Sequence, residues 1–192
     1  MENFLLLSQG IDTTPLMLAI RRQPELWKED TYLRDYPQGP FGEIESIMLR
    51  FQDRSGKAQQ DALESASNGG PFYDQHESID YPPYKTLTAA RPMIMNLMAY
   101  VGGERLGRAM INKIKPGGRI LPHVDSFEHA KYWDRFHIVL QSAPGVVFRC
   151  GEEKVYMGTG EVWWFQNAVD HEVINNSAED RIHLVIDIRT SK

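Results

Sequence analysis

The sequence has very little cysteine, and this limits the kinds of metal site that it can form. Of its 192 residues only one, Cys150, is a cysteine. A single thiol excludes an internal disulfide, and it excludes zinc or iron–sulfur sites that need several thiolates. Any bound metal must therefore be held by histidines and carboxylates, and the chain has six histidines.

Long apolar runs and an excess of positive charge are also missing. The apolar run near the N-terminus, residues 4–7, is far too short for a signal peptide or a membrane span. We therefore expect a cytoplasmic protein without a membrane partner. The formal net charge of −5 argues against binding nucleic acid through a basic surface, because phosphate contacts need cationic side chains.

The pattern of the chain changes near its middle. Residues 1–106 mix loops with helix signals, such as a proline after a hydroxyl residue at Thr14-Pro15, and with a strand expected at 45–51. From residue 107 to 188, short β-rich runs alternate with turn signals, which favours a sandwich or a small barrel. We expect one domain over residues 1–192, mainly β with some α, in which N-terminal helices cover the outer face of one sheet.

Two of the expected strands, residues 135–140 and 181–188, have one wholly apolar face and one polar face. The polar faces carry Arg135, His137, Arg181 and His183. Two interpretations are open. The apolar faces form the core and the polar faces meet solvent, or the apolar faces pack under the helices and the polar faces line a pocket inside a barrel.

The strongest local motif is His123-Val124-Asp125, after a turn and a short strand. Residues two apart on a strand project to the same side, so this imidazole and this carboxylate can reach one ion. A further histidine would complete the two-histidine, one-carboxylate triad of non-haem Fe(II) oxygenases. His171, which opens a strand after an aromatic run, is the favoured third ligand. The competing ligands are His129, His137 and His183, and the competing interpretation is a surface His-Asp pair at a strand end.

Five features together resemble the aspartyl/asparaginyl β-hydroxylase family of Fe(II)- and 2-oxoglutarate-dependent dioxygenases, which includes free-proline hydroxylases. In chain order they are Pro116-Gly117 leading to Pro122-His123, Arg135-Phe136-His137, Gly160-Glu161-Val162-Trp163, His171-Glu172-Val173-Ile174-Asn175, and Arg181 before an apolar strand. The resemblance covers residues 107–188. It implies a double-stranded β-helix there, a cupin-like jelly-roll barrel with helices packed outside.

The resemblance also implies roles for individual residues. His123 and His171 match the family's metal-binding histidines. Asp125 stands where the membrane-anchored animal members have glycine, and it completes the triad found in most 2-oxoglutarate oxygenases.

A second group of residues is implied to bind the cosubstrate. Arg181 matches the arginine that holds the distal carboxylate of 2-oxoglutarate. Arg135 and His137 match residues that contact the same molecule near the metal, and Asn112 takes the position of a serine that contacts it.

The implied activity is hydroxylation of an unactivated C–H bond with Fe(II), 2-oxoglutarate and O₂, yielding succinate and CO₂, with ascorbate as an in vitro reductant. We expect the substrate to be an amino acid, free or as an Asp, Asn or Pro-type side chain in a protein. An oxygenase of nucleotides or nucleic acid and a non-catalytic cupin-like binding module stay open as alternatives. Arg50, Arg119, Trp163 and His183 are candidates for substrate contact, against the alternatives of core packing or solvation. Two long segments, residues 126–133 and 67–83, are candidate lids.

Overall fold

The computed structural model describes residues 1–56 and 74–191. Residues 57–73, which include a helix predicted near 59–66 and the first part of the lid candidate at 67–83, lie outside this described part. The strands are β1 (Phe4–Ser8), β2 (Ile44–Phe51), β3 (Ile79–Asp80), β4 (Gly103–Ile114), β5 (Arg119–His123), β6 (Asp134–Gln141), β7 (Val146–Cys150), β8 (Glu153–Val155), β9 (Val162–Phe165), β10 (His171–Asn175) and β11 (Arg181–Thr190). The helices are α1 (Thr14–Arg21), α2 (Leu26–Glu29), α3 (Tyr32–Asp35), α5 (Pro82–Thr86), α6 (Ala90–Tyr100) and α7 (Phe127–Tyr132).

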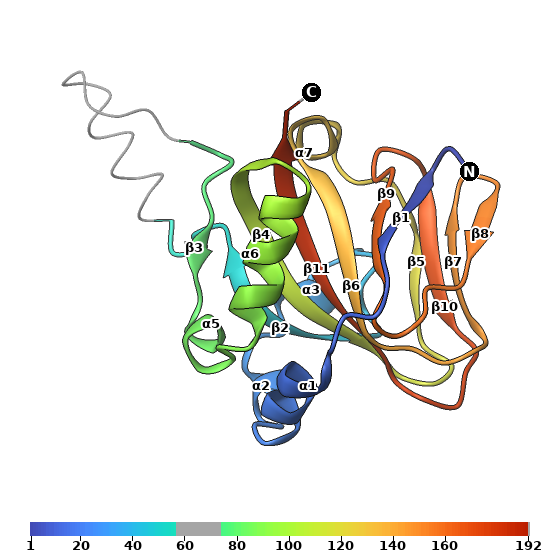
Figure 1. Cartoon of the computed structure of the whole chain (residues 1–192), viewed down its shortest axis with the longest axis horizontal. Helices are drawn as coiled ribbons and strands as arrows, with labels where there is room; N and C mark the ends of the chain where they lie inside the picture. Colours follow the sequence, from blue (N-terminus) through green and yellow to red (C-terminus); the bar gives the residue numbers. More distant parts are fainter. Residues whose placement is uncertain (57–73, 192) are drawn as a thin grey trace.

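The strands form two antiparallel sheets that face each other (Figure 1). The larger sheet has the order β1-β9-β6-β11-β4-β2-β3, and the smaller has the order β5-β10-β7-β8. Phe4 and Phe165 of the larger sheet share a buried apolar cluster with Phe148 and Val173 of the smaller one. Two facing sheets with a common interior make a jelly-roll barrel, so the predicted mainly β fold with helices is confirmed.

Helices α1 and α6 cover the outer face of the larger sheet (Figure 1). Leu16 and Ile20 of α1 and Ile94 and Leu97 of α6 are buried in one cluster with the outward-facing side chains of the sheet. These sheet residues include Ile47, Leu49, Ile111, Phe136, Ile138, Leu184 and Ile186. Each fully buried side chain of this size contributes about 1.5–3 kcal/mol. The apolar faces of β6 and β11 therefore pack under helices, which agrees with the second of the two interpretations of the sequence.

The opposite faces of β6 and β11 consequently point into the barrel. Arg135, His137, Arg181 and Val185 all line one inner cavity between the sheets. Because side chains alternate along a strand, the same register that packs Ile182 and Leu184 under the helices turns Arg181 inward. The alternation of side chains in these two strands thus indicates a polar cavity between the sheets.

The expected helix boundaries are close to those observed. Pro15 stands in the first turn of α1. Helix α6 ends just ahead of Gly102, whose φ of 63° is the left-handed conformation that favours glycine. The segment 126–133, read from its sequence as a loop, contains helix α7. Within residues 1–56 and 74–191, no helix has the length and apolar character needed to span a bilayer.

Candidate metal centre

The two histidines of the expected triad face each other across adjacent strands. In the antiparallel pair of β5 and β10, His123 lies directly opposite His171, and their ring centroids are 4.2 Å apart. Asp125 follows two residues after β5, and its Oδ1 is 3.8 Å from His123 Nε2. One ligand atom from each of the three side chains lies within 4.8 Å of the others. The fold therefore brings two imidazoles and a carboxylate to one point.

Backbone carbonyl groups fix the tautomer of both imidazoles. Nδ1 of His123 lies 2.8 Å from the oxygen of Leu121, and Nδ1 of His171 lies 2.8 Å from the oxygen of Val169. A ring nitrogen beside a carbonyl carries the proton, so Nε2 of each ring keeps its lone pair. Burial, reinforced by neighbouring His123, lowers the pKa of His171 to about 4, so this ring is neutral at pH 7. Both rings thus present a metal-binding atom, oriented as histidine ligands in proteins usually are.

The carboxylate of Asp125 is held by one oxygen only. Its Oδ2 accepts hydrogen bonds from Arg135 Nη1 at 2.6 Å and from Asn167 Nδ2 at 3.2 Å. The backbone N–H of Asp125 also donates to the oxygen of Asn167, at 3.3 Å. Oδ1 is left on the side of the histidines, so a metal would meet one anionic oxygen in a fixed orientation.

Arg135 is engaged on both sides by carboxylates. Its Nε and Nη2 donate to the two oxygens of Asp187, at 2.7 and 3.1 Å, while Nη1 donates to Asp125. Asp187 also lies 2.9 Å from His129 Nε2. The resemblance implied that Arg135 contacts 2-oxoglutarate. It does line the cavity, but its guanidinium bridges Asp125 and Asp187, and a cosubstrate contact for it stays a prediction.

Arg181 is a buried cation without an anion beside it. Its side chain is 1% exposed, and within the described residues it has no ion pair and its Nε has no hydrogen-bond partner. Burial alone lowers the pKa of Arg181 to about 9. Burying an unpaired charge costs several kcal/mol, so such a side chain indicates that an anion binds here.

His183 lies beside Arg181, and His137 lines the same cavity as Arg181. Nδ1 of His183 lies 3.0 Å from Arg181 Nη2 and 3.1 Å from His137 Nδ1. Because a guanidinium only donates, His183 accepts at Nδ1 and carries its proton on Nε2. Burial and the charge of Arg181 hold the pKa of both histidines well below the usual value. Nε2 of each ring is buried and has no partner in the described part of the chain.

The lining of this cavity includes the two histidines of the candidate triad together with Arg181. The lining residues are Phe41, Asn112, Ile120, His123, Arg135, His137, Phe148, Phe165, His171, Val173, Arg181 and Val185. The side-chain oxygen of Asn112 accepts a hydrogen bond from Ser46 at 2.9 Å. The cavity volume is about 40 Å³, room for a few water molecules.

Three residues expected to contact substrate lie away from this cavity. Arg50 follows a register shift in the β2–β4 pair and forms an ion pair with Asp80, on β3. Arg119 is exposed at the start of β5, where its backbone N–H donates to Glu43. Trp163 is buried in the inner cluster, and its Nε1 donates to Glu161 Oε2 at 2.8 Å. Arg50 and Arg119 form local ion pairs, and Trp163 packs in the inner cluster. His183, in contrast, lies beside Arg181.

Asp187 and Arg108, near the candidate triad, were not singled out from the sequence, whereas His129 was considered only as a competing metal ligand. Asp187 shares the polar face of β11 with Arg181 and His183, so alternation offered a signal for it. His129 is carried by α7, in a segment expected to be a loop. Arg108, on β4, donates to Gln52 at 3.0 Å and stacks its guanidinium carbon 4.6 Å from the ring centre of Phe51.

Arg108 also interacts electrostatically with the carboxylates near the candidate triad. Burial lowers the pKa of Arg108, and the charges of Asp187 and Asp125 act in the opposite direction. No ion pair of Arg108 occurs among the described residues. The residue is therefore a second partly dehydrated cation near the triad.

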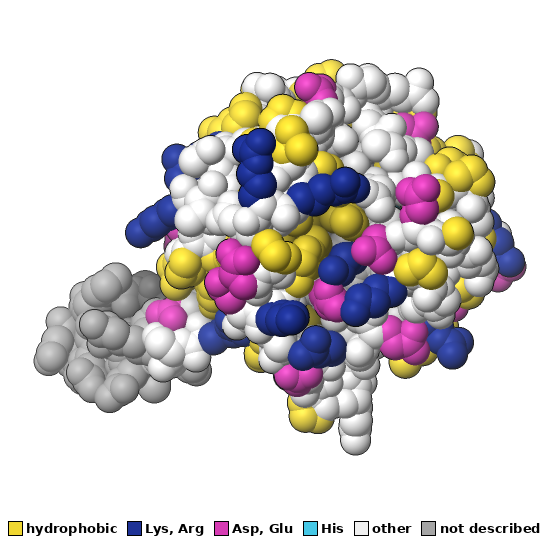
Figure 2. All heavy atoms as spheres, turned by 90° about the horizontal axis from the view of Figure 1, so that it is seen from below, with side chains coloured by type: hydrophobic (Ala, Val, Ile, Leu, Met, Phe, Trp, Pro, Cys, Tyr) yellow, Lys and Arg dark blue, Asp and Glu magenta, His cyan; other side chains and the backbone are white. Residues whose placement is uncertain are grey.

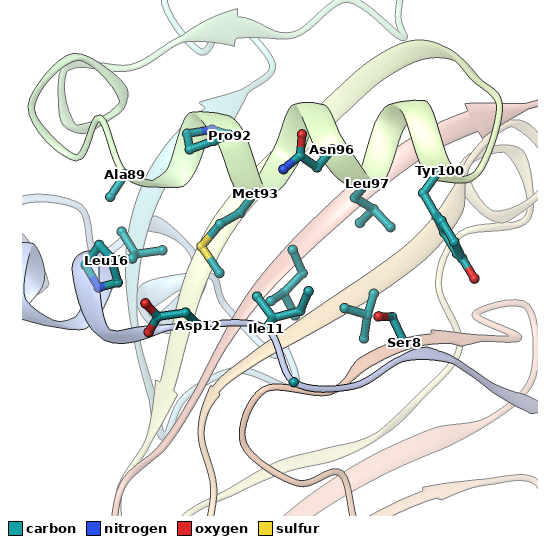
Figure 3. A pocket seen from close by; sticks show the side chains of 14 residues that line it. Ser8, Ile11, Asp12, Leu16, Ala89, Pro92, Met93, Asn96, Leu97 and Tyr100 are labelled. Carbon is teal, nitrogen blue, oxygen red and sulfur yellow. The ribbon is translucent and has the colours of Figure 1, made fainter.

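A roomier cavity of about 630 Å³ lies on the other side of the larger sheet, between α6 and the segment that joins β1 to α1 (Figure 3). Leu16, Met93, Leu97, Ile138 and Val162 give it an apolar lining. It includes one carboxylate, Asp12, and no histidine. The titratable groups needed for metal chemistry are thus in the smaller cavity, inside the barrel.

Comparison with known proteins agrees with this arrangement. The family model described as aspartyl/asparaginyl beta-hydroxylase matches residues 83–191. The L-proline cis-4-hydroxylase of Rhizobium meliloti is 30% identical over 82 residues, which are 42% of this chain and 29% of that protein. The L-proline cis-3-hydroxylase 1 of a Streptomyces species is 24% identical over 131 residues, which are 66% of this chain and 45% of that protein. The chain thus spans less than half the length of these curated relatives.

Solved structures show the same fold. An oxidoreductase of the 2OG-Fe(II) oxygenase family from Burkholderia pseudomallei aligns with a TM-score of 0.51 at 18% identity, covering 96% of this chain and 93% of that one. A Pseudomonas putida prolyl-4-hydroxylase aligns with a TM-score of 0.50 at 13% identity, covering 100% and 94%. With a family model that matches more than half of its length, the chain belongs to the aspartyl/asparaginyl β-hydroxylase family.

Proposed function

We propose that the protein is an Fe(II)- and 2-oxoglutarate-dependent dioxygenase that hydroxylates an unactivated C–H bond of an amino acid, with release of succinate and CO₂. One observation carries this proposal: two histidines and a buried arginine, which has no ion pair among the described residues, line the same cavity, and the carboxylate of Asp125 lies beside the two histidines. Family membership and the names of the two curated relatives support the reaction class.

The donor set fits Fe(II). Two imidazoles and one carboxylate oxygen would occupy three positions and leave others open for cosubstrate and O₂. His123 and His171 would bind through Nε2, and Asp125 would bind through Oδ1, since the other nitrogen or oxygen of each is already hydrogen-bonded. When bound, the iron and its cosubstrate supply the oxidising chemistry, and ascorbate in vitro keeps the iron reduced.

The far end of the cavity fits the distal carboxylate of 2-oxoglutarate. Arg181 offers a planar fork that matches a carboxylate, and Nε is among its unpartnered atoms. The adjacent His183 carries its proton on the ring nitrogen that also lacks a partner. A bound dianion would give these buried donors the acceptors that they lack.

Arg108 supports a carboxylate-bearing substrate. It is partly dehydrated, it has no ion pair in the described part of the chain, and it feels the charges of both Asp125 and Asp187. We infer that it pairs with the carboxylate of a free amino acid and thereby holds a side-chain carbon near the metal. Phe51, over which Arg108 stacks, adds an apolar contact surface beside it.

The charge distribution favours this substrate over a nucleic acid. The net charge is −5. On the face seen in Figure 2, Lys and Arg side chains are interspersed with Asp and Glu and form no continuous basic surface. A location in the cytoplasm is part of the same proposal.

The proposal is tested by incubating the protein with Fe(II), 2-oxoglutarate, ascorbate and air, with and without each free amino acid. We expect succinate to form slowly alone and faster with one amino acid, whose mass rises by one oxygen atom. A folded, metal-binding protein that forms no succinate would instead be a binding module. Stimulation by nucleotides rather than amino acids would move the substrate to that class.

A further inference from the structure

Asp187 is a fully buried carboxylate that is neither a member of the metal triad nor part of the anion-binding end of the cavity. It has no solvent exposure, and its oxygens accept hydrogen bonds from Arg135 and His129. Building on the proposed function, we propose that Asp187 is a positioning residue that acts through Arg135 to set the orientation and charge of the metal ligand Asp125.

The geometry of Arg135 makes it a rigid link between the two carboxylates. Asp187 and Arg135 are directly opposite each other in the β11–β6 pair. Asp187 holds the Nε–Nη2 edge of the guanidinium with both of its oxygens. A guanidinium is planar, so fixing one edge fixes the direction of the remaining N–H groups. Asp187 thereby aims Nη1 at Asp125 Oδ2, 2.6 Å away, and leaves Oδ1 toward the histidines.

The combined charge of Asp125, Arg135 and Asp187 also favours the binding of a cation. Alone, Arg135 and Asp125 would form a neutral pair, and the ligand would attract a divalent ion less strongly. With Asp187 included, two carboxylates share one guanidinium, so the group carries a net charge of −1. The same two carboxylates raise the pKa of Arg135, which keeps it charged. Asp187 thus lets an arginine orient the ligand without cancelling the charge that the metal needs.

Asp187 also fixes the segment that follows the ligand. His129 lies on α7, four residues after Asp125, and its Nε2 is 2.9 Å from Asp187 Oδ2. The same nitrogen lies 3.1 Å from Arg135 Nη2, so the His129 ring packs against both partners of the Asp187–Arg135 pair. Asp125 is therefore tied through Arg135, and α7 is tied through His129, to the same buried carboxylate on β11.

The test is the Asp187→Asn variant, which keeps the shape and removes the charge. Co(II) affinity is measured by calorimetry and the Co(II) environment by its visible absorption, with the melting temperature of the metal-free protein as the folding check. We expect Co(II) to bind about 10- to 100-fold more weakly, as is usual when a group that orients a ligand is lost, and its absorption bands to shift. Glu45→Gln is the matched control, because Glu45 pairs with Lys113 beside Trp27 in the outer cluster. It should leave both readouts unchanged.

The outcomes separate this proposal from the proposed function. Unchanged Co(II) affinity and spectrum in Asp187→Asn would overturn the positioning role, even if the variant melts at a lower temperature. If that variant does not fold, Arg135→Lys keeps the positive charge without the planar fork, and it should weaken Co(II) binding by a similar factor. Unchanged affinity there would equally overturn the proposal. Wild-type protein that binds Co(II) but turns over no 2-oxoglutarate would refute the proposed function alone.

Discussion

Replacing Arg181 with methionine should stabilise the cosubstrate-free protein while removing its response to 2-oxoglutarate. Burial, without an ion pair among the described residues, lowers the pKa of Arg181 to about 9. Each pKa unit of lowering corresponds to about 1.36 kcal/mol, so several kcal/mol is an upper bound on the cost of holding this charge in the fold. In proteins that become more stable when a buried charged group is replaced by an apolar group of similar volume, the gain is about 1–4 kcal/mol.

The sign of the pH dependence follows from the same shift. The folded-state pKa is lower than the unfolded one, so below pH 9 both states are protonated and the folded state carries the full cost. Above about pH 9 the unfolded state binds more protons, and the contribution of Arg181 to stability rises with pH. Arg181→Met should therefore gain most over the wild type near neutral pH and less at high pH.

Differential scanning fluorimetry with and without 2-oxoglutarate and Mn(II) checks this. We expect Arg181→Met to melt higher without 2-oxoglutarate, by about 2–4 °C for each kcal/mol gained. Its affinity for 2-oxoglutarate should fall by at least about 30-fold, since losing one partner of a buried charge pair costs 2 kcal/mol or more. Arg105→Met is the control, because Arg105 pairs with Asp74 at 2.7 Å and Glu77 at 2.6 Å. It should not melt higher, and it should keep its response to 2-oxoglutarate. A variant at Arg181 that melts lower and still responds would refute the reasoning.

Three further outcomes are expected. His123→Ala and Asp125→Ala should each abolish succinate formation and tight Mn(II) binding, since each removes one of three ligands; full activity of a His123/His171 double variant would refute the metal assignment. Arg108→Gln should raise the KM of the amino acid by about 10- to 100-fold, the loss of a charged hydrogen bond, while the Kd of 2-oxoglutarate stays unchanged. If the variant binds the amino acid and 2-oxoglutarate more weakly by the same factor, Arg108 does not serve the amino acid specifically. Burial raises the pKa of Cys150 to about 11, so this thiol should be inert to disulfide reagents at pH 8 until the protein unfolds; rapid labelling of folded protein would contradict its burial.

The grouping of the candidate ligands His123 and Asp125 was predictable because its signal is local. His123 and Asp125 are two residues apart beside a strand, and alternation along residues 181–188 marked an inward face for Arg181. These patterns depend only on the period of a strand. The helices that cover the larger sheet were also predictable, because the apolar faces of residues 135–140 and 181–188 could be buried by packing under helices.

The partners of Arg135 and Arg50 were not predictable, because they depend on pairings between distant segments. Arg135 meets Asp187, fifty-two residues away, only through the register of β6 against β11. Arg50 is placed by an irregularity in the β2–β4 pairing, which a regular alternation cannot show. The contact of His129 with Asp187 was not predictable either, because α7, which carries His129, is only six residues long and has a weak sequence signal.

The position of the two histidines at a sheet edge has a consequence for how the protein would lose its metal. Strand β5 is the outermost strand of the smaller sheet and pairs only with β10 in that sheet. An ion held by His123 and His171 would fasten the last residue of β5 to the first residue of β10, where the register is already irregular. Chelation would therefore do more than stop turnover. It would release this corner of the barrel to fray, so that iron supply also governs how readily amide protons exchange and proteases enter there.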